Sequence, residues 1–331
     1  MECAIFCVDA GEQASDFEGV QIFESRQKNS RDFKVFREIH YATQTFMPDL
    51  VHAWLPASIT VPAMSVAAWK QIPSIVSYRN EQRFRRAVHL AEYLAACFLA
   101  HGVASNTAIE RSSWPYRSLY RRKRGCLIRN AVHLPHEPAE GNDDRPTLPN
   151  PDKPITLLYV GRLTKQKNWQ CLIRALPLIA PQYDLRLTVC GDGEDENDLI
   201  SLIAELGISD RVDILGYRAD VYDIMKQANW LVMPSWYEGM PNVLMEALAM
   251  GLPCLASDIP AVRDVIDGQR CVLTFDPHSP ENLAALIDRA LNNADMLETL
   301  RNNGLTLSKS FSVEHMAQQY AQYYKEVVAN G

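Results

Sequence analysis

Short apolar runs alternate with segments of helical apolar spacing through the second half of the chain. The runs predict strands at 155–161, 185–191, 211–216, 229–235, 252–257 and 271–275. The segments between them predict helices at 168–179, 195–207, 219–228, 242–251 and 261–266. Buried strands that alternate with helices form a parallel sheet with helices on both faces, so we expect a doubly wound α/β domain. Ligands bind at the carboxyl ends of such strands, which directs attention to the loops after Gly161, Gly191, Gly216 and Ser235.

The first half shows the same alternation. Candidate strands lie at 3–9, 20–25, 50–55, 74–78, 97–102 and 125–130. The segment 136–153 is rich in Pro, Asp and Glu and has neither the helical nor the strand spacing of apolar residues. It therefore predicts a linker between domains at 1–135 and 154–311. The final segment, 312–331, reads as a long aromatic helix that packs back on the first domain.

Length and composition agree with two packed domains. The chain has 331 residues, of which 47% are apolar and 22% charged, and this excludes a disordered protein. No apolar run reaches the roughly 18 residues of a membrane-spanning helix, and the N-terminus lacks a signal-peptide pattern. We therefore expect a cytoplasmic protein. The eight cysteines include no C-x-x-C pair, which favours reduced, buried thiols over disulfides or a zinc site.

Charge divides unevenly along the chain. Residues 1–133 hold 17 Lys and Arg against 12 Asp and Glu, whereas residues 134–331 hold 16 against 28. In the basic half, Arg111–Arg124 interleaves cations with Trp114, Tyr116 and Tyr120. This segment reads either as a solvated helix face or as a contact with an anionic membrane surface. No nucleic-acid-binding motif is present, so we expect no nucleic-acid partner.

Two strand-end loops carry candidate chemistry. After the first strand of the second domain, Arg162 and Lys167 lie beside a helix start, which predicts an anion site suited to a diphosphate. After the fourth strand, Glu238 and Glu246 stand eight residues apart. Carboxylates accept hydrogen bonds from neighbouring hydroxyl groups, as the sugar and ribose of a nucleotide sugar would supply. Between them, the unpaired amides of Asn242, Val243 and Leu244 are expected to point at an anion.

Several motifs together resemble a known family. PDLVHAWLP, YVGRLTKQKN, VCGDGE, ILGY and PSWYEGMPNVLMEALAMGLPCLAS look like the group-1 (family 4) retaining glycosyltransferases. The resemblance covers the second domain almost completely and the first from about Cys3 to Val132. It implies the GT-B fold, in which two Rossmann-like doubly wound domains face each other across a cleft.

The resemblance also implies roles for individual residues. Arg162 and Lys167 would bind the donor diphosphate, Glu238 the donor sugar and Glu246 the ribose. Tyr217 would lie near the nucleobase. The implied catalytic residues are Glu238, Arg162 and Lys167. The implied donor-binding residues are Gly161, Arg162, Lys167, Tyr217, Glu238, Gly239, Met240, Pro241, Asn242, Val243, Leu244 and Glu246.

The implied reaction is metal-independent hexosyl transfer with retention. A UDP-, GDP- or ADP-sugar would donate to a glycan or lipid-linked acceptor in surface polysaccharide or envelope glycan synthesis, and no other cofactor is expected. The sequence lacks an Asp-x-Asp metal-binding pair. Front-side displacement is the favoured mechanism, with Glu238 as a covalent nucleophile the alternative. The protein would act in the cytoplasm, with peripheral attachment to the inner membrane face as a further expectation.

Three positions depart from the family pattern. No Gly-rich loop precedes the first strand, so we expect that about one βα unit of the family's first domain is missing here or that the family's pattern has decayed. Arg79 stands where the family often has a His facing the sugar, and is the acceptor-side candidate. Asn130-Ala131 replaces the usual Asn-Gly. These departures keep open a non-catalytic GT-B subunit or scaffold. A GT-B epimerase would need further acid–base groups, and a phosphorylase of this fold usually carries a pyridoxal-binding lysine; neither can be identified in this sequence.

Overall fold

The computed structural model describes residues 2–7, 19–25, 34–54, 57–78, 94–107, 125–132, 154–179 and 183–330. The chain forms two compact units. Unit 1 comprises Met1–Ile128 together with Ala317–Gly331, and unit 2 comprises Arg129–Met316. The segment 136–153, expected to be a linker, lies outside the described residues.

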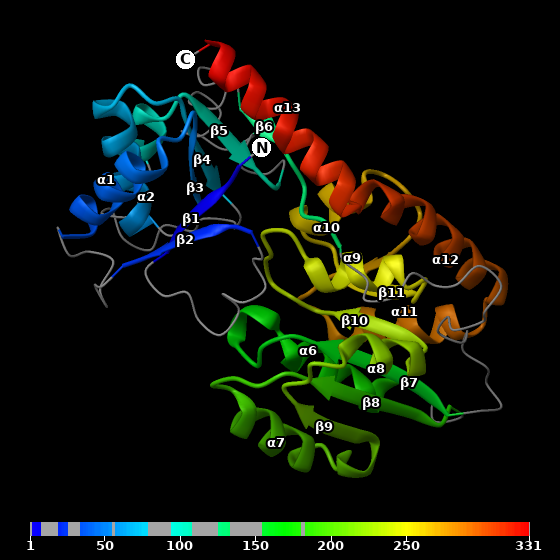
Figure 1. Ribbon diagram of the computed structural model, residues 1–331. Helices are drawn as coiled ribbons and strands as arrows, with labels where there is room; N and C mark the ends of the chain where they lie inside the picture. Colours follow the sequence, from blue (N-terminus) through cyan, green and yellow to red (C-terminus); the bar gives the residue numbers. More distant parts are fainter. Residues whose placement is uncertain are drawn as a thin grey trace. The chain divides into compact units, whose positions relative to one another are not determined.

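Unit 2 alternates strands with helices along the chain (Figure 1). Its elements are β7 (Ile155–Val160), η2 (Lys165–Lys167), α6 (Trp169–Ala175), η3 (Leu176–Leu178), β8 (Leu185–Cys190), α7 (Glu196–Glu205), η4 (Ser209–Arg211), β9 (Val212–Gly216), α8 (Val221–Gln227), β10 (Trp230–Met233), α9 (Asn242–Ala249), β11 (Cys254–Ser257), α10 (Pro260–Ile266), β12 (Leu273–Phe275), α11 (Pro280–Leu291), α12 (Ala294–Ser308), η5 (Lys309–Phe311) and the start of α13 (Val313–Asn330). The six strands predicted from apolar runs are confirmed within two residues at each end.

The six strands of unit 2 form one parallel sheet in the order β12-β11-β10-β7-β8-β9. The chain begins this sheet in the middle at β7, runs outward to β9, crosses to β10 and runs outward again to β12. This is the doubly wound order predicted from the sequence.

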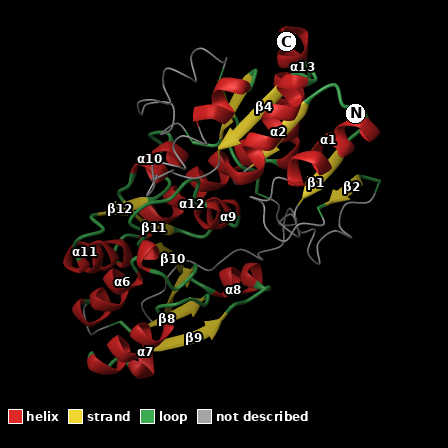
Figure 2. Ribbon diagram, turned by 90° about the vertical axis from the view of Figure 1, so that its left-hand side faces the viewer, coloured by secondary structure: helices red, strands yellow, loops and turns green. Residues whose placement is uncertain are grey.

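Helices cover both faces of this sheet. Figure 2 shows α6, α7 and α11 on one side of the strands and α8 and α9 on the other. One large core joins α6, α7 and α11 to the sheet, with Trp230, Phe275 and Leu172 almost completely buried in it. The central strand β10 and its neighbour β11 are buried along their whole length, whereas β8 and the edge strand β9 expose Arg186 and Asp213.

Local signals in the sequence set several helix ends. Ser279 caps α11 by accepting from the amide of Asn282, and Asn293 caps α12 by accepting from the amide of Met296. Gly207 ends α7 in the left-handed region, with φ of 65°. Neither α11 nor α12 was predicted, although both carry these capping residues.

The described residues of unit 1 form two parallel sheets. Its elements are β1 (Ala4–Cys7), β2 (Gln21–Glu24), α1 (Lys34–Phe46), β3 (Val51–Trp54), α2 (Ala57–Trp69), β4 (Ser74–Tyr78), β5 (Gly102–Ser105), β6 (Cys126–Leu127) and, from Ala317 onward, α13. Strands β3, β4, β5 and β6 pair in that order, whereas β1 and β2 pair with each other.

One strand prediction in unit 1 is wrong. The run 97–102 was expected to be a strand, but residues 94–99 are helical and β5 begins only at Gly102. Ala96, Cys97 and Ala100 are buried while Phe98 is 74% exposed, which is the one-sided burial of a helix. Periodicity cannot separate a helix from a strand in so short an apolar run.

The last helix completes unit 1. In α13, Tyr323 is buried and its hydroxyl donates to the carbonyl of Val103 on β5 at 3.3 Å. A Cβ at Gly102 would touch that same tyrosine, so the glycine leaves room for the ring. The hydroxyl of Tyr324 also lies 2.7 Å from Nδ1 of His52 on β3. The helix therefore packs on the four-stranded sheet through its aromatic face.

Two further expectations concern cysteines and membranes. All eight cysteines are free thiols, and Cys97, Cys171, Cys190, Cys254 and Cys271 are buried. Across the part of the chain that the structure describes, no helix combines the length and apolarity needed to cross a bilayer.

Candidate functional site

The strand order of unit 2 has one switch point. The order reverses between β7 and β10, and the loops that follow these two strands both lie at that point. Doubly wound sheets bind ligands at this position. Arg162 and Lys167 follow β7, and Glu238 follows β10, so the topology brings together the two loops singled out from the sequence.

An ion pair between the partly buried Lys167 and the buried Glu238 joins these loops. Nζ of Lys167 lies 2.7 Å from Oε1 of Glu238, and the hydroxyl of Ser235 donates to the same oxygen at 2.6 Å. Glu238 is only 7% exposed. A carboxylate at this depth needs a countercharge and hydrogen bonds, and Lys167 and Ser235 supply both. Within the described residues, Oε2 of Glu238 accepts no hydrogen bond from protein.

Lys167 and Glu238 were expected to serve different parts of a donor, the diphosphate and the sugar, and their direct contact with each other was not predicted. Ser235 was not predicted as a site residue. Its signal was a hydroxyl residue at the end of a buried strand, immediately before the candidate loop.

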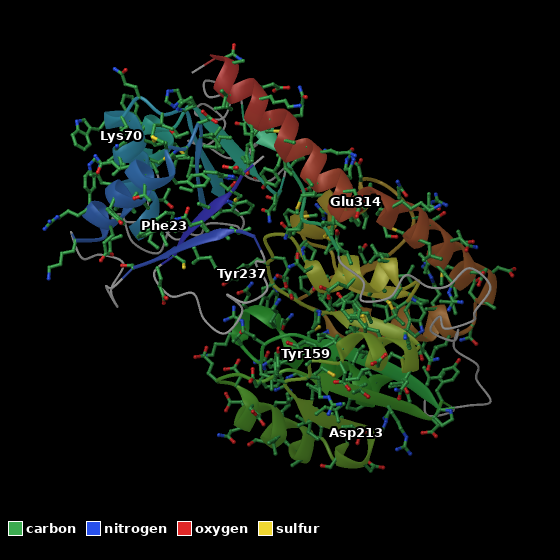
Figure 3. All side chains as sticks on the ribbon, viewed as in Figure 1. Phe23, Lys70, Tyr159, Asp213, Tyr237 and Glu314 are labelled. Atoms are coloured by element: carbon green, nitrogen blue, oxygen red, sulfur yellow. The ribbon has the colours of Figure 1, made fainter. Side chains whose placement is uncertain are left out.

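Arg162 differs from Lys167. It is exposed and forms no ion pair within the described residues. Its backbone is fixed by a hydrogen bond, because the hydroxyl of Tyr159 on β7 donates to the carbonyl of Arg162 at 3.0 Å. Burial, and then the nearby carboxylates of Glu238 and Asp195, raise the pKa of Tyr159, so the phenol stays a neutral donor. Figure 3 labels Tyr159 in the sheet and Tyr237 in the loop after β10.

The loop after β8 supports the loop after β7 through its backbone. The amide of Leu163 donates to Asp192 at 2.7 Å, and the amide of Asp195 donates back to Leu163 at 3.0 Å. A Cβ at Gly191 would collide with the carbonyl of Gly161. The GDGE motif is therefore a close-packed support for the cationic loop.

The start of α9 corrects one prediction. The amide of Leu244 was expected to be unpaired, but it donates to the carbonyl of Pro241 at 3.1 Å, as a first helical turn tightens. Leu244 is fully buried. The amides of Asn242 and Val243 have no acceptor within the described residues, so two amides rather than three can meet an anion.

Glu246 lies on the second turn of α9, as expected, and is partly buried. Burial raises the pKa of its carboxyl. Burial and the Glu246 charge together raise the pKa of Tyr222 on α8 to about 12. Glu246 is therefore an acceptor in a poorly solvated position, which favours a hydroxyl ligand.

Residues 129–130, expected to end the last strand of the first domain, lie in unit 2 and contact the α9 loop. Nδ2 of Asn130 donates to Oδ1 of Asn242 at 2.8 Å, and the Asn130 amide lies 3.1 Å from Sδ of Met240. Arg129 forms an ion pair with Asp264 at 3.4 Å. Asn130 was noted only as part of a departure from a motif, although it holds the loop that carries Gly239 and Pro241.

Other predicted residues are distributed as follows. Tyr217 follows β9 and is 76% exposed. Gly161 ends β7 beside the Lys167 side chain. Arg79 and the basic segment Arg111–Arg124 lie outside the described residues. Among the described residues, no group of three or more His, Cys, Asp or Glu side chains gathers as metal ligands would.

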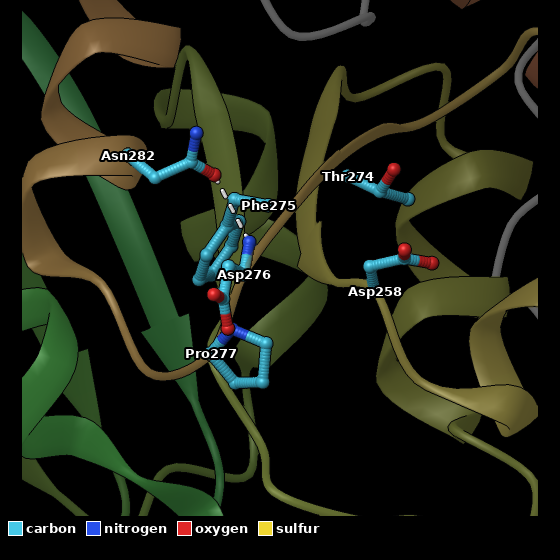
Figure 4. Close-up of a pocket in the computed structure, with 6 residues that line it drawn as sticks. All are labelled: Asp258, Thr274, Phe275, Asp276, Pro277 and Asn282. Atoms are coloured by element: carbon cyan, nitrogen blue, oxygen red, sulfur yellow. Dashed lines mark hydrogen bonds between the residues drawn. The ribbon is translucent and has the colours of Figure 1, made fainter.

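A pocket of roughly 400 Å³ opens nearby, at the carboxyl ends of β11 and β12 (Figure 4). Its walls are Asp258, Thr274, Phe275, Asp276, Pro277 and Asn282. Asp258 is engaged by Arg263, which keeps the pKa of that carboxyl low. None of the predicted donor residues lines this pocket, so the ion pair and its loops remain the candidate site.

Known proteins place the chain in a family. The family model described as glycosyl transferases group 1 matches residues 141–306, half of the chain. An uncharacterised glycosyltransferase from Methanocaldococcus jannaschii is 31% identical over 172 residues, 51% of this chain and 44% of the relative. LpsD, a lipopolysaccharide core biosynthesis glycosyltransferase from Rhizobium meliloti, is 29% identical over 186 residues, 56% of this chain and 53% of the relative. The chain thus spans about half the length of the curated relatives it matches.

Solved structures extend the likeness to both units. The structure of Anabaena HepE in complex with UDP aligns with a TM-score of 0.79 and 18% identity, over 98% of this chain and 92% of that one. At this identity the match concerns the fold, which is GT-B. The chain belongs to the group 1 family of glycosyltransferases.

Proposed function

We propose that the protein is a retaining glycosyltransferase that moves a hexosyl group from a nucleotide sugar to a glycan or lipid-linked acceptor. The observation that carries this proposal is the Lys167–Glu238 pair, with Ser235, at the strand-order reversal of unit 2. A largely buried charged pair at a ligand-binding position costs stability that a purely structural role would not require.

The donor would bind through groups that the protein leaves unsatisfied. Arg162 and the amides of Asn242 and Val243 suit a diphosphate, since cations and helix-start amides both stabilise anions. Oε2 of Glu238 can accept from a sugar hydroxyl, Glu246 can accept from the ribose diol, and exposed Tyr217 can stack on a base. The complex of HepE with UDP is consistent with a uridine nucleotide.

The charges explain how transfer would proceed. Breaking the bond between the sugar C1 and the phosphate oxygen places negative charge on the leaving diphosphate and positive charge on the sugar ring. Lys167 and Arg162 would stabilise the diphosphate, and Glu238 the ring. We favour front-side displacement. The acceptor oxygen bonds to C1 on the face that the phosphate leaves, and the acceptor proton passes to the departing phosphate oxygen.

Because these two cations supply the positive charge, the proposal needs no metal ion. We expect transfer to continue at an unchanged rate, within about twofold, in excess EDTA. A rate that collapses in EDTA and recovers with added Mg²⁺ or Mn²⁺ would contradict this part of the proposal.

The acceptor and the location follow from a relative and from the basic segment of the chain. LpsD acts in lipopolysaccharide core biosynthesis, which is consistent with a surface glycan product. The basic segment Arg111–Arg124 would suit attachment to the inner face of a membrane from the cytoplasm. Sedimentation with vesicles that contain or lack anionic lipid tests this attachment.

Donor binding can be tested without knowing the acceptor. A nucleoside diphosphate that binds only the folded protein stabilises it by about 2.7 kcal/mol at 100-fold excess over its Kd. We expect UDP, GDP or ADP to raise the melting temperature, and Glu246→Ala to reduce that rise. If all three nucleotides leave the melting temperature unchanged, a non-catalytic subunit becomes the better reading.

A further inference from the structure

Asn168 occupies an unusual backbone position between the cationic loop and helix α6. It lies in the left-handed region, with φ of 49° and ψ of 36°, and is only 4% exposed. It ends the short helix η2 and immediately precedes α6. Its side chain makes no helix-capping hydrogen bond, so the amide group is directed elsewhere.

The Asn168 side chain connects three strand-end loops. Nδ2 donates to the carbonyl of Pro234 at 2.9 Å and to the carbonyl of Pro277 at 3.0 Å. Pro234 lies between β10 and Ser235, and Pro277 lies in the loop after β12. One buried amide therefore ties the end of the β7 loop to the loops after β10 and β12.

These contacts flank both members of the ion pair. Lys167 precedes Asn168 in the chain, and Ser235, which hydrogen bonds to Glu238, follows Pro234. A second connection runs in parallel, because the Trp236 amide donates to Gln166 at 2.9 Å and Nε2 of Gln166 donates to Tyr237 at 3.0 Å. The spacing between the β7 loop and the β10 loop is thus set by hydrogen bonds outside the ion pair.

We infer that Asn168 is a positioning residue for transfer: its amide fixes the Lys167 ammonium against Glu238 in the geometry that the reacting sugar phosphate requires. The inference rests on the proposed function. Small displacements of groups that act on a transition state reduce rate more than they reduce ground-state binding. We call the two hydrogen bonds from Asn168 to Pro234 and Pro277 the Asn168 brace. The donor contacts proposed for Glu246 and Tyr217 do not involve these bonds, so donor affinity should largely survive when the brace is removed.

Two substitutions distinguish the effect of the Asn168 side-chain hydrogen bonds from that of its left-handed backbone conformation. Asn168→Gly keeps the left-handed conformation at no steric cost and removes both hydrogen bonds. Asn168→Asp keeps the shape but replaces the donor with a carboxylate that faces two carbonyl oxygens. Asp267→Gly is the matched control, because Asp267 is also left-handed, with φ of 46°, but is exposed at the end of α10.

The test compares steady-state transfer by these variants at a temperature well below their melting points. We expect Asn168→Gly to lower kcat by roughly tenfold with a donor KM within about threefold of wild type. Asn168→Asp should lower kcat further than Asn168→Gly does, and Asp267→Gly should have the kcat of wild type. A role in stability alone would lower the melting temperature of Asn168→Gly without changing kcat, and that result would overturn the inference.

A structure of Asn168→Gly provides a readout that does not depend on activity. We expect the distance from Nζ of Lys167 to Oε1 of Glu238 to exceed about 3.5 Å in that variant, beyond hydrogen-bond range. If the distance is unchanged, Asn168 does not position the pair. If wild type transfers no sugar but the pair separates in the variant, the brace stands and the proposed function fails.

Discussion

Lys167 and Glu238 are the two charged side chains of the site that pair with each other away from solvent. Sequence reasoning identified both residues but not their contact, because they are 71 positions apart and each has an ordinary surface explanation. Only the strand order places them together. The partners that fix their geometry, Ser235 and Asn168, are polar residues at strand and helix ends. Nothing in the local sequence distinguishes them from capping or turn residues.

Removing one partner of the pair should destabilise the fold. Lys167→Ala leaves Glu238 buried without its countercharge, and we expect the free energy of unfolding to fall by about 3 kcal/mol, the lower end for such a pair because Lys167 is partly exposed. Chemical denaturation measures this loss. Adding Glu238→Gln to the same variant should restore part of it, because a neutral amide needs no countercharge. A Lys167→Ala protein as stable as wild type would show that the pair is not desolvated.

Glu246 should affect stability in the opposite direction. Burial raises the pKa of its carboxyl, so the folded state holds the proton more tightly than the unfolded chain. Stability is then lost as pH rises from the unfolded pKa through the raised folded pKa. Glu246→Gln removes this loss. The variant should melt above wild type at pH 7, and the difference should vanish below about pH 4.

The control for this comparison is Glu205→Gln, which changes an exposed carboxylate on α7. Melting curves from pH 4 to pH 8 should superimpose for this control and wild type. If Glu246→Gln melts below wild type at pH 7, the buried carboxylate is stabilised by contacts that outweigh its desolvation.

At the level of elements, the sequence predicts unit 2 better than unit 1. The strand β7 lies between two layers of helices, so its apolar run is long, and it ends at Gly161. In unit 1 the run 97–102 was taken for a strand because it is too short to reveal a period. The helix α12, with Asn293 as its cap, was missed because its mixed polar composition gives a weak apolar face.

The close packing of the loop after β8 against the loop after β7 could not be predicted from the sequence. Gly191 has φ of 145°, and a side chain there would strike the Gly161 carbonyl. We expect Gly191→Ala to cost about 2–3 kcal/mol and to displace the cationic loop. Gly207→Ala, at φ of 65° with open space around it, should cost only about 1 kcal/mol. Equal losses in the two variants would argue against the collision.

At the scale of the whole molecule, the last helix returns to the unit that contains the first residues. Its aromatic pattern predicted packing on the first domain but could not identify the partners. Tyr323 and Gly102 supply them in the structure. We expect Tyr323→Ala to lower the free energy of unfolding by about 3 kcal/mol, because a buried ring leaves a cavity. Lys325→Ala, which changes an exposed residue of the same helix, should have no measurable effect.

The most direct test of the account is donor consumption by the purified protein. A panel of UDP-, GDP- and ADP-sugars, with hydrolysis or transfer followed by release of the nucleoside diphosphate, would be compared for wild type, Lys167→Ala and Glu246→Ala. We predict that wild type consumes at least one donor and that Lys167→Ala slows that reaction by roughly 10²-fold or more, the scale for loss of a charge-stabilising group. Glu246→Ala should raise the donor KM. Failure of wild type to consume any donor, or unchanged turnover in both variants, would contradict the account.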